Sequence, residues 1–461
     1  MKVSPEIFKA YDIRCIPGQD CDAKTFYLIG QEMVKALDAK KMAIGRDARE
    51  SSPRLQQALI QGVLDAGADV VDLGLITTPM LYFSSHFLPD VDSAMSVTAS
   101  HNPGEWNGAK ACLRDAVPVG QEEAFEQVRE RVLARQDEEI EVPEEAHSSQ
   151  GQLSKRDIKE DYYRYFSKFA KLGDKKFKVV IDCANTMGVL ELPFYEKYLA
   201  DNFEVVKMYC DLENSAYRNA HEANPLKTET LQELQEKVKE EQADLGIAYD
   251  GDADRVGFVD EKGEIIPMDL VTGLIAKVFL EDEKNKGRIF LYDLRSSRAV
   301  KEVIEENGGI AHECRVGHTL IKKQMREEDA LFAGELSGHY YFQANKNGEV
   351  STLAALTLLN LMAETGQPIS ELVQDLRRYY HSGEINFVVQ DKEAVMNKLK
   401  EIYSDGQLSE LDGIKIDYPD WWFNVRPSNT EPVLRLNMEA KTAELLEEKK
   451  REIIDLIRQY S

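Results

Sequence analysis

The chain has 461 residues, which is too long for one ordinary hydrophobic core, so we expect three or four domains. Charged residues make up 30% of the sequence and hydrophobic residues 43%, as is typical of globular proteins. The net charge of −25 argues against general binding to nucleic acid or anionic membranes, whose phosphates attract cations. A small phosphorylated substrate is still compatible, because it needs only a few arginines and lysines in one cleft.

The sequence also bears on the cellular compartment. No apolar run approaches the roughly 18 residues that span a bilayer, and residues 1–5 lack the apolar core of a signal peptide. Six cysteines occur singly, at positions 15, 21, 112, 183, 210 and 314, without metal-type pairing. We therefore expect a cytoplasmic protein whose cysteines are reduced.

The first part of the chain alternates between strands and helices. Residues 41–47 predict a buried strand, and a helix begins at Ser52, with proline in its first turn. Further strands are predicted at 68–75 and 93–97, and the last of these leads directly into a loop that contains Ser100. This alternation indicates an α/β unit around a largely parallel sheet.

The same pattern recurs twice further along the chain. The second copy has strands at 178–182, 203–209 and 243–249 with a helix at 190–199, and the third has strands at 288–292, 309–315 and 330–332 with a helix at 298–307. The last strand feeds a loop with Asp250 in one copy and a loop with Glu335 in the other. Ligands of such units gather at the carboxyl ends of strands, so we expect three related domains whose loops face a common cleft.

Residues beyond about 370 break the pattern. Strands are predicted there at 384–389, 414–418, 421–425 and 433–439, and helices at 392–403 and 442–460. The predicted fold is therefore α/β: three related α/β domains with mixed sheets plus a C-terminal α+β domain with an antiparallel sheet, arranged around a central cleft. Changes in composition place the domains at 1–150, 151–258, 259–368 and 369–461.

The loop after the third strand places a hydroxyl beside an imidazole, in Thr98-Ala-Ser100-His101-Asn-Pro. A serine hydroxyl can carry a phosphoryl group if a base, a metal or a reactive donor activates it. An ordinary turn, in which serine and asparagine cap the local backbone, explains the same residues. The sequence has no Gly-x-Ser-x-Gly here, so a hydrolase triad is not supported.

Three alternating carboxylates, those of Asp250, Asp252 and Asp254, follow the last strand of the second copy. Such neighbours repel one another, and oxygen-only ligands suit Mg²⁺, so we favour a metal site over a plain polar turn. A calcium loop is not supported, because Arg255 follows where the pattern of such a loop would continue. The guanidinium of Arg255 can pair with phosphoryl oxygens.

The segment Glu335-Leu-Ser337-Gly-His339 alternates polar side chains, which would share one face if the backbone is extended. A carboxylate beside two groups that donate and accept suits vicinal sugar hydroxyls, although a solvated turn accounts for it equally well.

A last loop contains Arg426, Ser428, Asn429 and Thr430, and Arg435 lies on the strand that follows. These groups suit a phosphate dianion, and the alternative is a plain turn between strands.

Four further residues are candidates near the same chemistry. Tyr11 and Arg14 lie close to the N-terminus, Lys110 follows Ser100 by ten residues, and His318 comes after a strand predicted to end near residue 315. Each has a simple structural alternative: a surface ion pair, a solvated lysine or a histidine without a role in function.

In this order, the four loops resemble those of the α-D-phosphohexomutase superfamily, and most closely those of bacterial phosphomannomutase/phosphoglucomutase. The resemblance spans essentially all 461 residues and includes the segment Phe-Lys-Ala-Tyr-Asp-Ile-Arg at 8–14. It implies four domains: three related α/β units and a last domain with a helix-backed antiparallel sheet.

The resemblance also implies roles. Ser100 would be phosphorylated and would join Asp250, Asp252 and Asp254 as a ligand of one Mg²⁺, while Lys110 and Arg255 would assist phosphoryl transfer. Glu335 and Ser337 would bind sugar hydroxyls, and Arg426, Ser428, Asn429 and Thr430 the non-reacting phosphate. We add as catalytic candidates His101, Arg14 and His318, and as substrate-binding candidates Tyr11, Arg295, His339 and Arg435. The general base is left open among Lys110, His318 and Tyr11.

By this resemblance, the phosphoserine donates its group to a hexose 1- or 6-phosphate. The resulting hexose 1,6-bisphosphate turns over in the cleft and returns its other phosphate, and it also serves as activator. Leu336, Thr98 and Asn429 favour mannose or glucose over glucosamine.

The chain departs from the family pattern at three places. Cys15 stands where glycine is usual and Arg295 where lysine is common, and arginine can neutralise charge but cannot act as a base. The segment 219–221 replaces a usual Pro-Asn-His.

Other functions stay open on the residues alone. They are a phosphoglucosamine mutase, a Mg²⁺-dependent sugar phosphatase in which water attacks, and a non-catalytic phosphosugar-binding protein. We expect a small-molecule phosphosugar as partner, no nucleic acid or membrane, and a monomer or weak homodimer.

Overall fold

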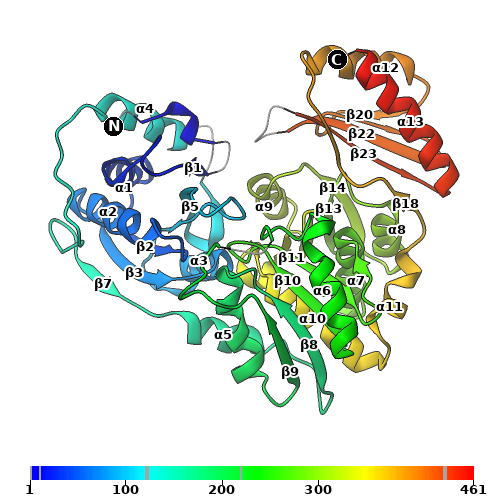
Figure 1. Ribbon diagram of the computed structural model, residues 1–461, viewed down its shortest axis with the longest axis horizontal. Coiled ribbons are helices and arrows are strands. Elements are labelled where there is room, and N and C mark those ends of the chain that lie inside the picture. Colours follow the sequence, from blue (N-terminus) through cyan, green and yellow to red (C-terminus); the bar gives the residue numbers. More distant parts are fainter. Residues whose placement is uncertain (1–2, 10–11, 120–123, 219–220, 429–432, 461) are drawn as a thin grey trace. The chain divides into compact units, whose positions relative to one another are not determined.

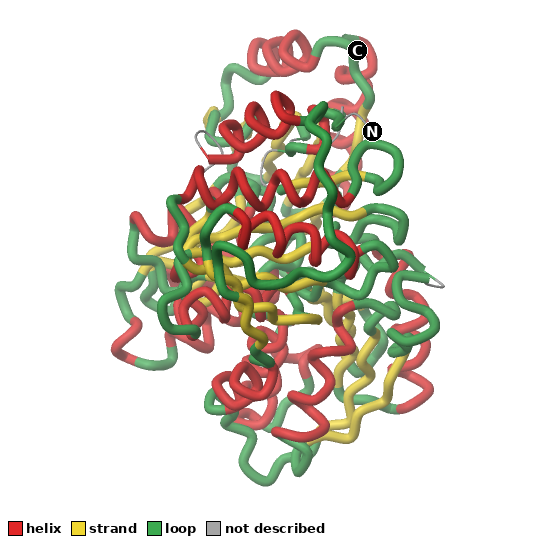
Figure 2. The backbone as a smooth tube through the Cα atoms, turned by 90° about the vertical axis from the view of Figure 1, so that its left-hand side faces the viewer, coloured by secondary structure: helices red, strands yellow, loops and turns green. Residues whose placement is uncertain are grey.

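The computed structural model describes residues 3–9, 12–119, 124–218, 221–428 and 433–460. The chain forms two compact units. The first unit consists of Met1–Ile266 and Ser337–Ser370, and the second of Pro267–Leu336 and Glu371–Ser461. In both units helices pack against sheets, with loops joining them (Figure 1, Figure 2).

The first sheet of the first unit has seven strands in the order β1-β5-β4-β2-β3-β7, with β6 paired to β5. Their bounds are β1 Ile13–Cys15, β2 Lys41–Arg46, β3 Asp69–Leu75, β4 Ser93–Val97, β5 Asn107–Leu113, β6 Val117–Pro118 and β7 Leu153–Lys155. The pairs β2–β3, β2–β4 and β3–β7 are parallel, whereas β5 runs antiparallel to β1 and β4. All residues of β4 are buried, as expected of a central strand covered on both faces. The loop after β4 carries Ser100.

The sequence specifies where the helices of this region begin. Asp22 caps α1 by accepting a hydrogen bond from the backbone N–H of Thr25, and Pro53 lies in the first turn of α2. The helices and short helical turns are η1 Pro5–Ile7, α1 Ala23–Leu37, α2 Ser52–Asp65, α3 Thr78–Phe87, η2 Arg114–Ala116 and α4 Glu126–Arg135.

The second sheet of this unit has the order β12-β11-β10-β8-β9. Its strands are β8 Phe177–Asp182, β9 Phe203–Met208, β10 Leu245–Tyr249, β11 Val256–Asp260 and β12 Ile265–Ile266. β8 pairs in parallel with β9 and β10, while β11 is antiparallel to both of its neighbours. The loop between β10 and β11 contains the three aspartates, so it connects an antiparallel pair at the carboxyl end of β10.

The helix predicted at 190–199 is present, but its type is mixed. The structure has a 3₁₀ turn, η4 (Met187–Glu191), and a π-helical turn, η5 (Phe194–Tyr198), joined by Leu192 and Pro193 in α-helical conformation. Proline has no backbone N–H to donate to the preceding turn, which accords with the change of hydrogen-bond pattern at this residue. The other elements of this unit are α5 Lys159–Ser167, η6 Thr228–Leu231, α6 Gln232–Glu241, β16 Tyr340–Phe342, η8 Gln343–Asn345, β17 Gly348–Glu349 and α10 Ser351–Thr365.

The second unit begins with a parallel arrangement in which β13 pairs with β14 and β15. The bounds are α7 Met268–Leu280, η7 Glu283–Asn285, β13 Ile289–Asp293, α8 Arg298–Glu306, β14 Ile310–Cys314, α9 His318–Glu327 and β15 Phe332–Gly334. The short helix α11 (Ile369–Leu372) spans the boundary between the units, and η9 (Gln374–Leu376) follows it.

An antiparallel sheet completes the second unit, in the order β18-β23-β22-β21-β20 with β19 also paired to β23. Its strands are β18 Tyr380–His381, β19 Ile385–Phe387, β20 Gln407–Ser409, β21 Ile414–Asp417, β22 Trp421–Pro427 and β23 Leu434–Ala440. The helices α12 (Lys392–Ile402) and α13 (Ala443–Gln459) lie together on one face of this sheet (Figure 1). The predicted mixed α/β sheets and the antiparallel α+β region are therefore confirmed.

Among the described residues, none of the helices combines the length and the apolar character needed to cross a membrane.

Candidate active site

The Ser100 loop presents its hydroxyl from a backbone conformation that is uncommon for serine. Ser100 has φ 53°, in the left-handed region, and is 1% exposed. Its backbone N–H donates to Thr98 Oγ1 at 3.2 Å, and its Oγ lies 3.2 Å from His101 Nδ1. Such a conformation persists only when the surroundings fix it, and it is frequent at functional sites. Burial first, and then the charges of Arg255, Arg14 and Lys110, lower the pKa of the His101 imidazole well below its usual range.

The metal loop, residues 250–255, brings its three carboxylates together. One oxygen from each of Asp250, Asp252 and Asp254 lies within 4.8 Å of the others, and all three side chains are buried. The loop is closed by a backbone hydrogen bond from Asp250 N to Arg255 O at 3.2 Å. Burial, and then the charges of Asp254 and Asp252, raise the pKa of the Asp250 carboxyl well above its usual range. The cluster therefore favours the binding of a cation.

The two loops are in direct contact. Ser100 Oγ donates to Asp250 Oδ2 at 3.4 Å. A Cβ atom at Gly251 would lie 2.1 Å from the carbonyl oxygen of Ser100, so only glycine allows this backbone approach. The structure thus joins the serine and the first aspartate that the sequence analysis selected separately.

Lys110 reaches the same carboxylates from β5. Its Nζ lies 2.6 Å from Asp252 Oδ2 and 2.5 Å from Asp254 Oδ2. Burial alone would lower the pKa of this ammonium, but the two carboxylates raise it above its usual range, which keeps it charged. Among the described residues, no group hydrogen-bonds to the buried Asp252 Oδ1. This oxygen-rich set fits a hard divalent cation such as Mg²⁺, which would compete with the ammonium of Lys110.

Arg255 and His339 extend the cluster. Arg255 Nε lies 3.3 Å from His339 Nε2 and 3.9 Å from Asp250 Oδ2, and His339 Nε2 lies 3.3 Å from Asp254 Oδ1. Ser337 Oγ is 2.9 Å from His339 Nδ1. A guanidinium and an imidazole therefore border the three acids, as binding of a phosphoryl group requires.

The segment 335–339 is not extended throughout, so the condition for a shared face of its polar side chains is not met. Residues 336 and 337 form a turn, and Gly338 has φ 86°. The turn interrupts the alternation, so the three side chains do not line one face of a strand.

Arg14 fastens the Ser100 loop from β1. Its Nη1 donates to Ala99 O at 2.7 Å and to the side-chain oxygen of Asn102, and its Nε pairs with Asp12 Oδ2 at 2.8 Å. In the Ser100 loop, Arg14 therefore contacts the backbone of Ala99 and the side chain of Asn102.

A second arginine, which was not among the predicted site residues, makes more hydrogen bonds to the Ser100 loop than Arg14 does. Arg49 is 1% exposed, and its guanidinium donates to the carbonyl oxygens of Ser100, Asn102, Pro103 and Trp106. Its Nε pairs with Asp47 Oδ2 at 2.9 Å. No short motif marks this role, because the bonded carbonyls lie more than 50 residues further along the chain.

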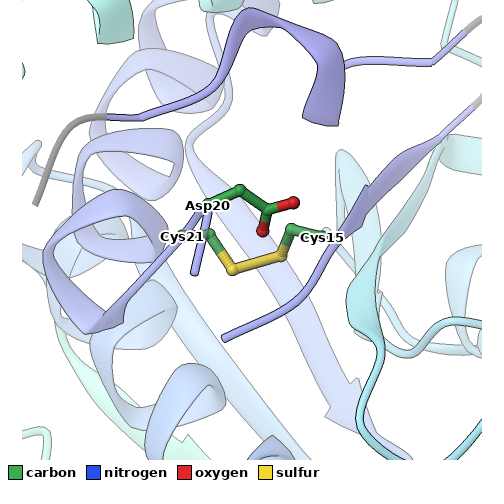
Figure 3. A group of neighbouring side chains, drawn as sticks. All are labelled: Cys15, Asp20 and Cys21. Carbon is green, nitrogen blue, oxygen red and sulfur yellow. A yellow bond between two sulfur atoms is a disulfide. The ribbon is translucent and has the colours of Figure 1, made fainter. Parts of the chain in front are cut away.

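A disulfide lies directly after Arg14 in the sequence. Cys15 at the end of β1 is bonded to Cys21, and both are buried (Figure 3). Asp20 lies beside the pair and accepts a hydrogen bond from Ile16 N at 2.5 Å. The expectation that all six cysteines are reduced is wrong for this pair. The cysteines at 112, 183, 210 and 314 form no disulfide within the described part of the chain.

The candidates of the second unit gather around Arg295. Arg295 Nη2 pairs with Asp293 Oδ2 at 2.7 Å and lies 3.7 Å from Glu335 Oε2. The backbone N–H of Leu336 donates to Asp293 Oδ2 at 2.7 Å, which holds the turn that carries Glu335.

Arg426 and Arg435, on the paired strands β22 and β23, converge on the carboxylate of Glu384, at 3.3 and 3.0 Å. Arg295 also reaches this carboxylate, at 3.2 Å. Ser428 follows β22 and donates its backbone N–H to Val433 O at 2.9 Å.

Some candidates lie elsewhere or outside the described residues. The strand predicted to end near residue 315 ends at Cys314, and His318 begins α9 after Gly317, which has φ 132°. Tyr11, Asn429 and Thr430 lie outside the described residues.

Comparison with known proteins gives family matches along nearly the whole chain. Four family models match in order: Phosphoglucomutase/phosphomannomutase alpha/beta/alpha domain I at residues 5–139, domain II at 160–263, domain III at 267–380 and the C-terminal domain at 384–456.

Relatives match at nearly full length. A protein described as phosphomannomutase from Methanocaldococcus jannaschii is 40% identical, with 98% of this chain and 97% of the relative covered. A phosphomannomutase/phosphoglucomutase from Pseudomonas aeruginosa is 36% identical, with 96% and 93% covered. The crystal structure of a phosphoglucomutase/phosphomannomutase family protein from Burkholderia thailandensis is 30% identical, covers 99% of this chain and 98% of its own, and has a TM-score of 0.88. The four matched domains and these relatives show that the chain belongs to the phosphoglucomutase/phosphomannomutase family.

Proposed function

We propose that the protein interconverts hexose 1-phosphate and hexose 6-phosphate, with mannose, glucose or both as the sugar, and that Ser100 carries the phosphoryl group. The observation that carries this proposal is the approach of Ser100 Oγ to within 3.4 Å of Asp250 Oδ2, inside a cluster of three buried carboxylates. A hydroxyl held there can exchange a phosphoryl group only if the added negative charge is neutralised. The family of the chain supports the same reaction.

Asp250, Asp252 and Asp254 would hold one Mg²⁺, and an oxygen of phosphorylated Ser100 would complete the ligand set. When bound, this ion neutralises charge on the transferring group and orients its oxygens. The fit rests on the oxygen donors and on Asp252 Oδ1, which is buried and has no hydrogen bond within the described part of the chain.

The chain's own residues align the transfer. Arg255 is placed to bind phosphoryl oxygens, and Lys110 supplies a second fixed positive charge beside Asp252 and Asp254. His101 Nδ1 lies 3.2 Å from Ser100 Oγ and would orient the free hydroxyl, whose proton is donated to Asp250. Arg14 joins them by holding the loop in position.

Substrate recognition would fall to the remaining candidates. Arg295, Glu335, Ser337 and His339 would bind sugar hydroxyls, with Tyr11 and His318 as further contacts. Arg426, Ser428, Asn429, Thr430 and Arg435 would bind the phosphate that is not reacting. Since the two ends of the sugar exchange roles, a hexose 1,6-bisphosphate is the intermediate, and adding it restores any enzyme that has lost its phosphoryl group.

We further propose domain limits at 1–150, 151–258, 259–368 and 369–461, and a cytoplasmic monomer or weak homodimer. The four matched family regions each fall largely within one of these ranges, which supports the limits.

A coupled assay tests the function. Mannose, glucose and glucosamine 1-phosphates are supplied with Mg²⁺ and a hexose 1,6-bisphosphate, and formation of the 6-phosphate is measured beside release of free phosphate. We expect mannose or glucose 1-phosphate to be converted without net phosphate release, and Ser100→Ala to lower the rate by about 1,000-fold or more. Phosphate release without isomerisation would identify a phosphatase. Negligible turnover of all three sugars would contradict the proposal.

A further inference from the structure

Glu384 lies immediately before β19, at the end of the short connection from β18. In this connection Gly383 has φ 68°, and the backbone N–H of Ser382 donates to Met438 O at 2.9 Å on β23. The Glu384 side chain is 11% exposed. It is therefore largely withdrawn from water and held by the backbone at a fixed place.

Three arginines bind this single carboxylate. Arg295 Nη1 and Arg426 Nη2 lie 3.2 and 3.3 Å from Glu384 Oε2, and Arg435 Nη1 lies 3.0 Å from Oε1. Both carboxylate oxygens are engaged, and the cations approach from different elements. An anion surrounded by several guanidinium groups is how proteins hold phosphate.

Positive and negative charges are equal in number among the described residues of this cluster. They are the guanidinium groups of Arg295, Arg426 and Arg435 and the carboxylates of Asp293, Glu335 and Glu384. Asp293 already takes two hydrogen bonds from the Arg295 guanidinium, at 2.7 and 3.0 Å, whereas Glu384 pairs with Arg426 and Arg435, at 3.3 and 3.0 Å. A phosphate dianion that joined the cluster unchanged would face a carboxylate at close range, which costs free energy.

Arg426 keeps donor capacity for a ligand. It is 1% exposed, and within the described chain no group hydrogen-bonds to its buried Nε. Burial, and then the neighbouring charge of Arg295, lower the pKa of its guanidinium. The unbonded Nε and the cost of burying this positive charge both favour binding of an additional anion to Arg426 once the Glu384 carboxylate has moved away.

We propose that Glu384 is an internal counter-ion that competes with the substrate phosphate: in the free protein its carboxylate binds Arg426 and Arg435, and phosphate binds by taking these contacts over. This inference rests on the proposed function, in which these arginines bind the non-reacting phosphate. Competition from the Glu384 carboxylate lowers the affinity of the two arginines for phosphate, while the site stays selective for phosphate. A bisphosphate can then release one end, turn and bind by the other, because the carboxylate restores the arginines' contacts as the phosphate leaves.

The test compares the affinity of wild type and Glu384→Gln for inorganic phosphate, measured by titration calorimetry at fixed ionic strength. We expect the variant to bind phosphate about tenfold more tightly, which corresponds to about 1.4 kcal/mol of removed repulsion. We expect its KM for the sugar phosphate to fall and its kcat to fall as well, because the bisphosphate is held longer. If Glu384 only positioned the arginines, the variant would bind phosphate more weakly, which would overturn the proposal, as would equal affinity.

Glu439→Gln is the matched control. Glu439 is also a buried glutamate of this unit, and its Oε1 accepts hydrogen bonds from Trp422 Nε1 and Arg298 N at 2.9 and 3.0 Å. Its neutralisation should leave phosphate affinity within about twofold of wild type. A tenfold gain in this control too would assign the effect to net charge and overturn the proposal.

Hydrogen exchange on the wild-type protein provides a second test that needs no variant. Saturating phosphate should speed exchange in residues 382–385, whose side-chain anchor is released, and slow it in β22 near Arg426. Slower exchange in both segments would contradict release of Glu384. If the coupled assay shows mutase activity while these results are negative, only the competition is wrong. If wild type shows neither activity nor phosphate binding, the proposed function fails with it.

Discussion

The two units use buried carboxylates in opposite ways. In the first unit, Asp250, Asp252 and Asp254 lie within 4.8 Å of one another, and Lys110 pairs with two of them. In the second unit, three arginines pair with the one carboxylate of Glu384. Negative charge is in excess among the described residues of the first cluster, which favours a metal ion. In the second cluster the described charges are equal in number, so we expect an anion to displace a contact when it binds. The same chemical group thus promotes binding at one site and restrains it at the other.

The variant with the largest expected effect tests the excess of negative charge in the aspartate cluster of the first unit. Asp252→Asn removes one of three carboxylates, and we expect Mg²⁺ affinity to fall by about 100-fold, the upper end of what even outer-shell changes cost. Activity should fall with it and recover partly at high Mg²⁺. Calorimetric titration with Mg²⁺ and the coupled assay measure the two effects.

Asp260→Asn serves as the comparison for that variant. Asp260 is equally buried in the first unit, but it accepts hydrogen bonds from the backbone of Lys262 and Glu264. Its neutralisation should leave Mg²⁺ affinity unchanged. Unchanged Mg²⁺ affinity in Asp252→Asn would show that the acidic cluster is not the metal site.

A second prediction separates the effect of the position of the Ser100 loop from the effect of the charge of the aspartate cluster. Arg49 gives its hydrogen bonds to four carbonyl oxygens around Ser100, so Arg49→Met should displace the loop without touching the acids. We expect activity to fall about 100-fold, since a shift of about 1 Å has that cost. Stability should fall by about 3 kcal/mol, because the buried Asp47 carboxylate loses its charged partner. Enzyme kinetics and thermal unfolding are the measurements.

The control is Arg54→Met. Arg54 also donates to two backbone carbonyls, those of Val142 and Pro143, but these lie in a different loop. Its loss should affect stability alone. Equal losses of activity in both variants would argue against a special role for Arg49.

The smallest effect concerns a third kind of buried carboxylate, whose hydrogen bonds come from hydroxyls. Glu191 accepts them from Thr77 and Thr352, and burial raises the pKa of its carboxyl to about 7. The folded protein then keeps a proton that the unfolded chain releases near its ordinary pKa of about 4.5, so stability falls as pH rises from about 5 to 8.

Glu191→Gln removes this titration. Relative to wild type it should gain about 2–3 kcal/mol between pH 5 and pH 8, seen as a difference in melting temperature that grows with pH. A difference that does not change with pH would contradict the raised pKa.

Much of the fold and the choice of loops could be predicted, because the relevant signals are local. Buried strands such as 93–97 and 243–249 are short apolar runs, and each leads into a loop with Ser100 or Asp250. Parallel units place such loops at the carboxyl ends of strands, so motif and topology gave the same prediction.

The contacts that fix the loops could not be predicted in this way. Arg49 binds carbonyl groups, which every residue has, so no residue type marks its targets. The Cys15–Cys21 disulfide follows no motif and depends on how β1 and the start of α1 meet. The turn at 336–337 replaces an extended segment because Asp293, more than 40 residues away, binds the N–H of Leu336.

The backbone contact at Gly251 has a consequence for how this site can vary. Any side chain at this position would push against the carbonyl of Ser100, since even a Cβ atom would come within 2.1 Å of it. The distance between the serine and the aspartates is therefore set by the contact between the backbone of Gly251 and the backbone of Ser100. Substitutions elsewhere can retune charge, specificity or release, while the gap across which phosphate would travel keeps its width.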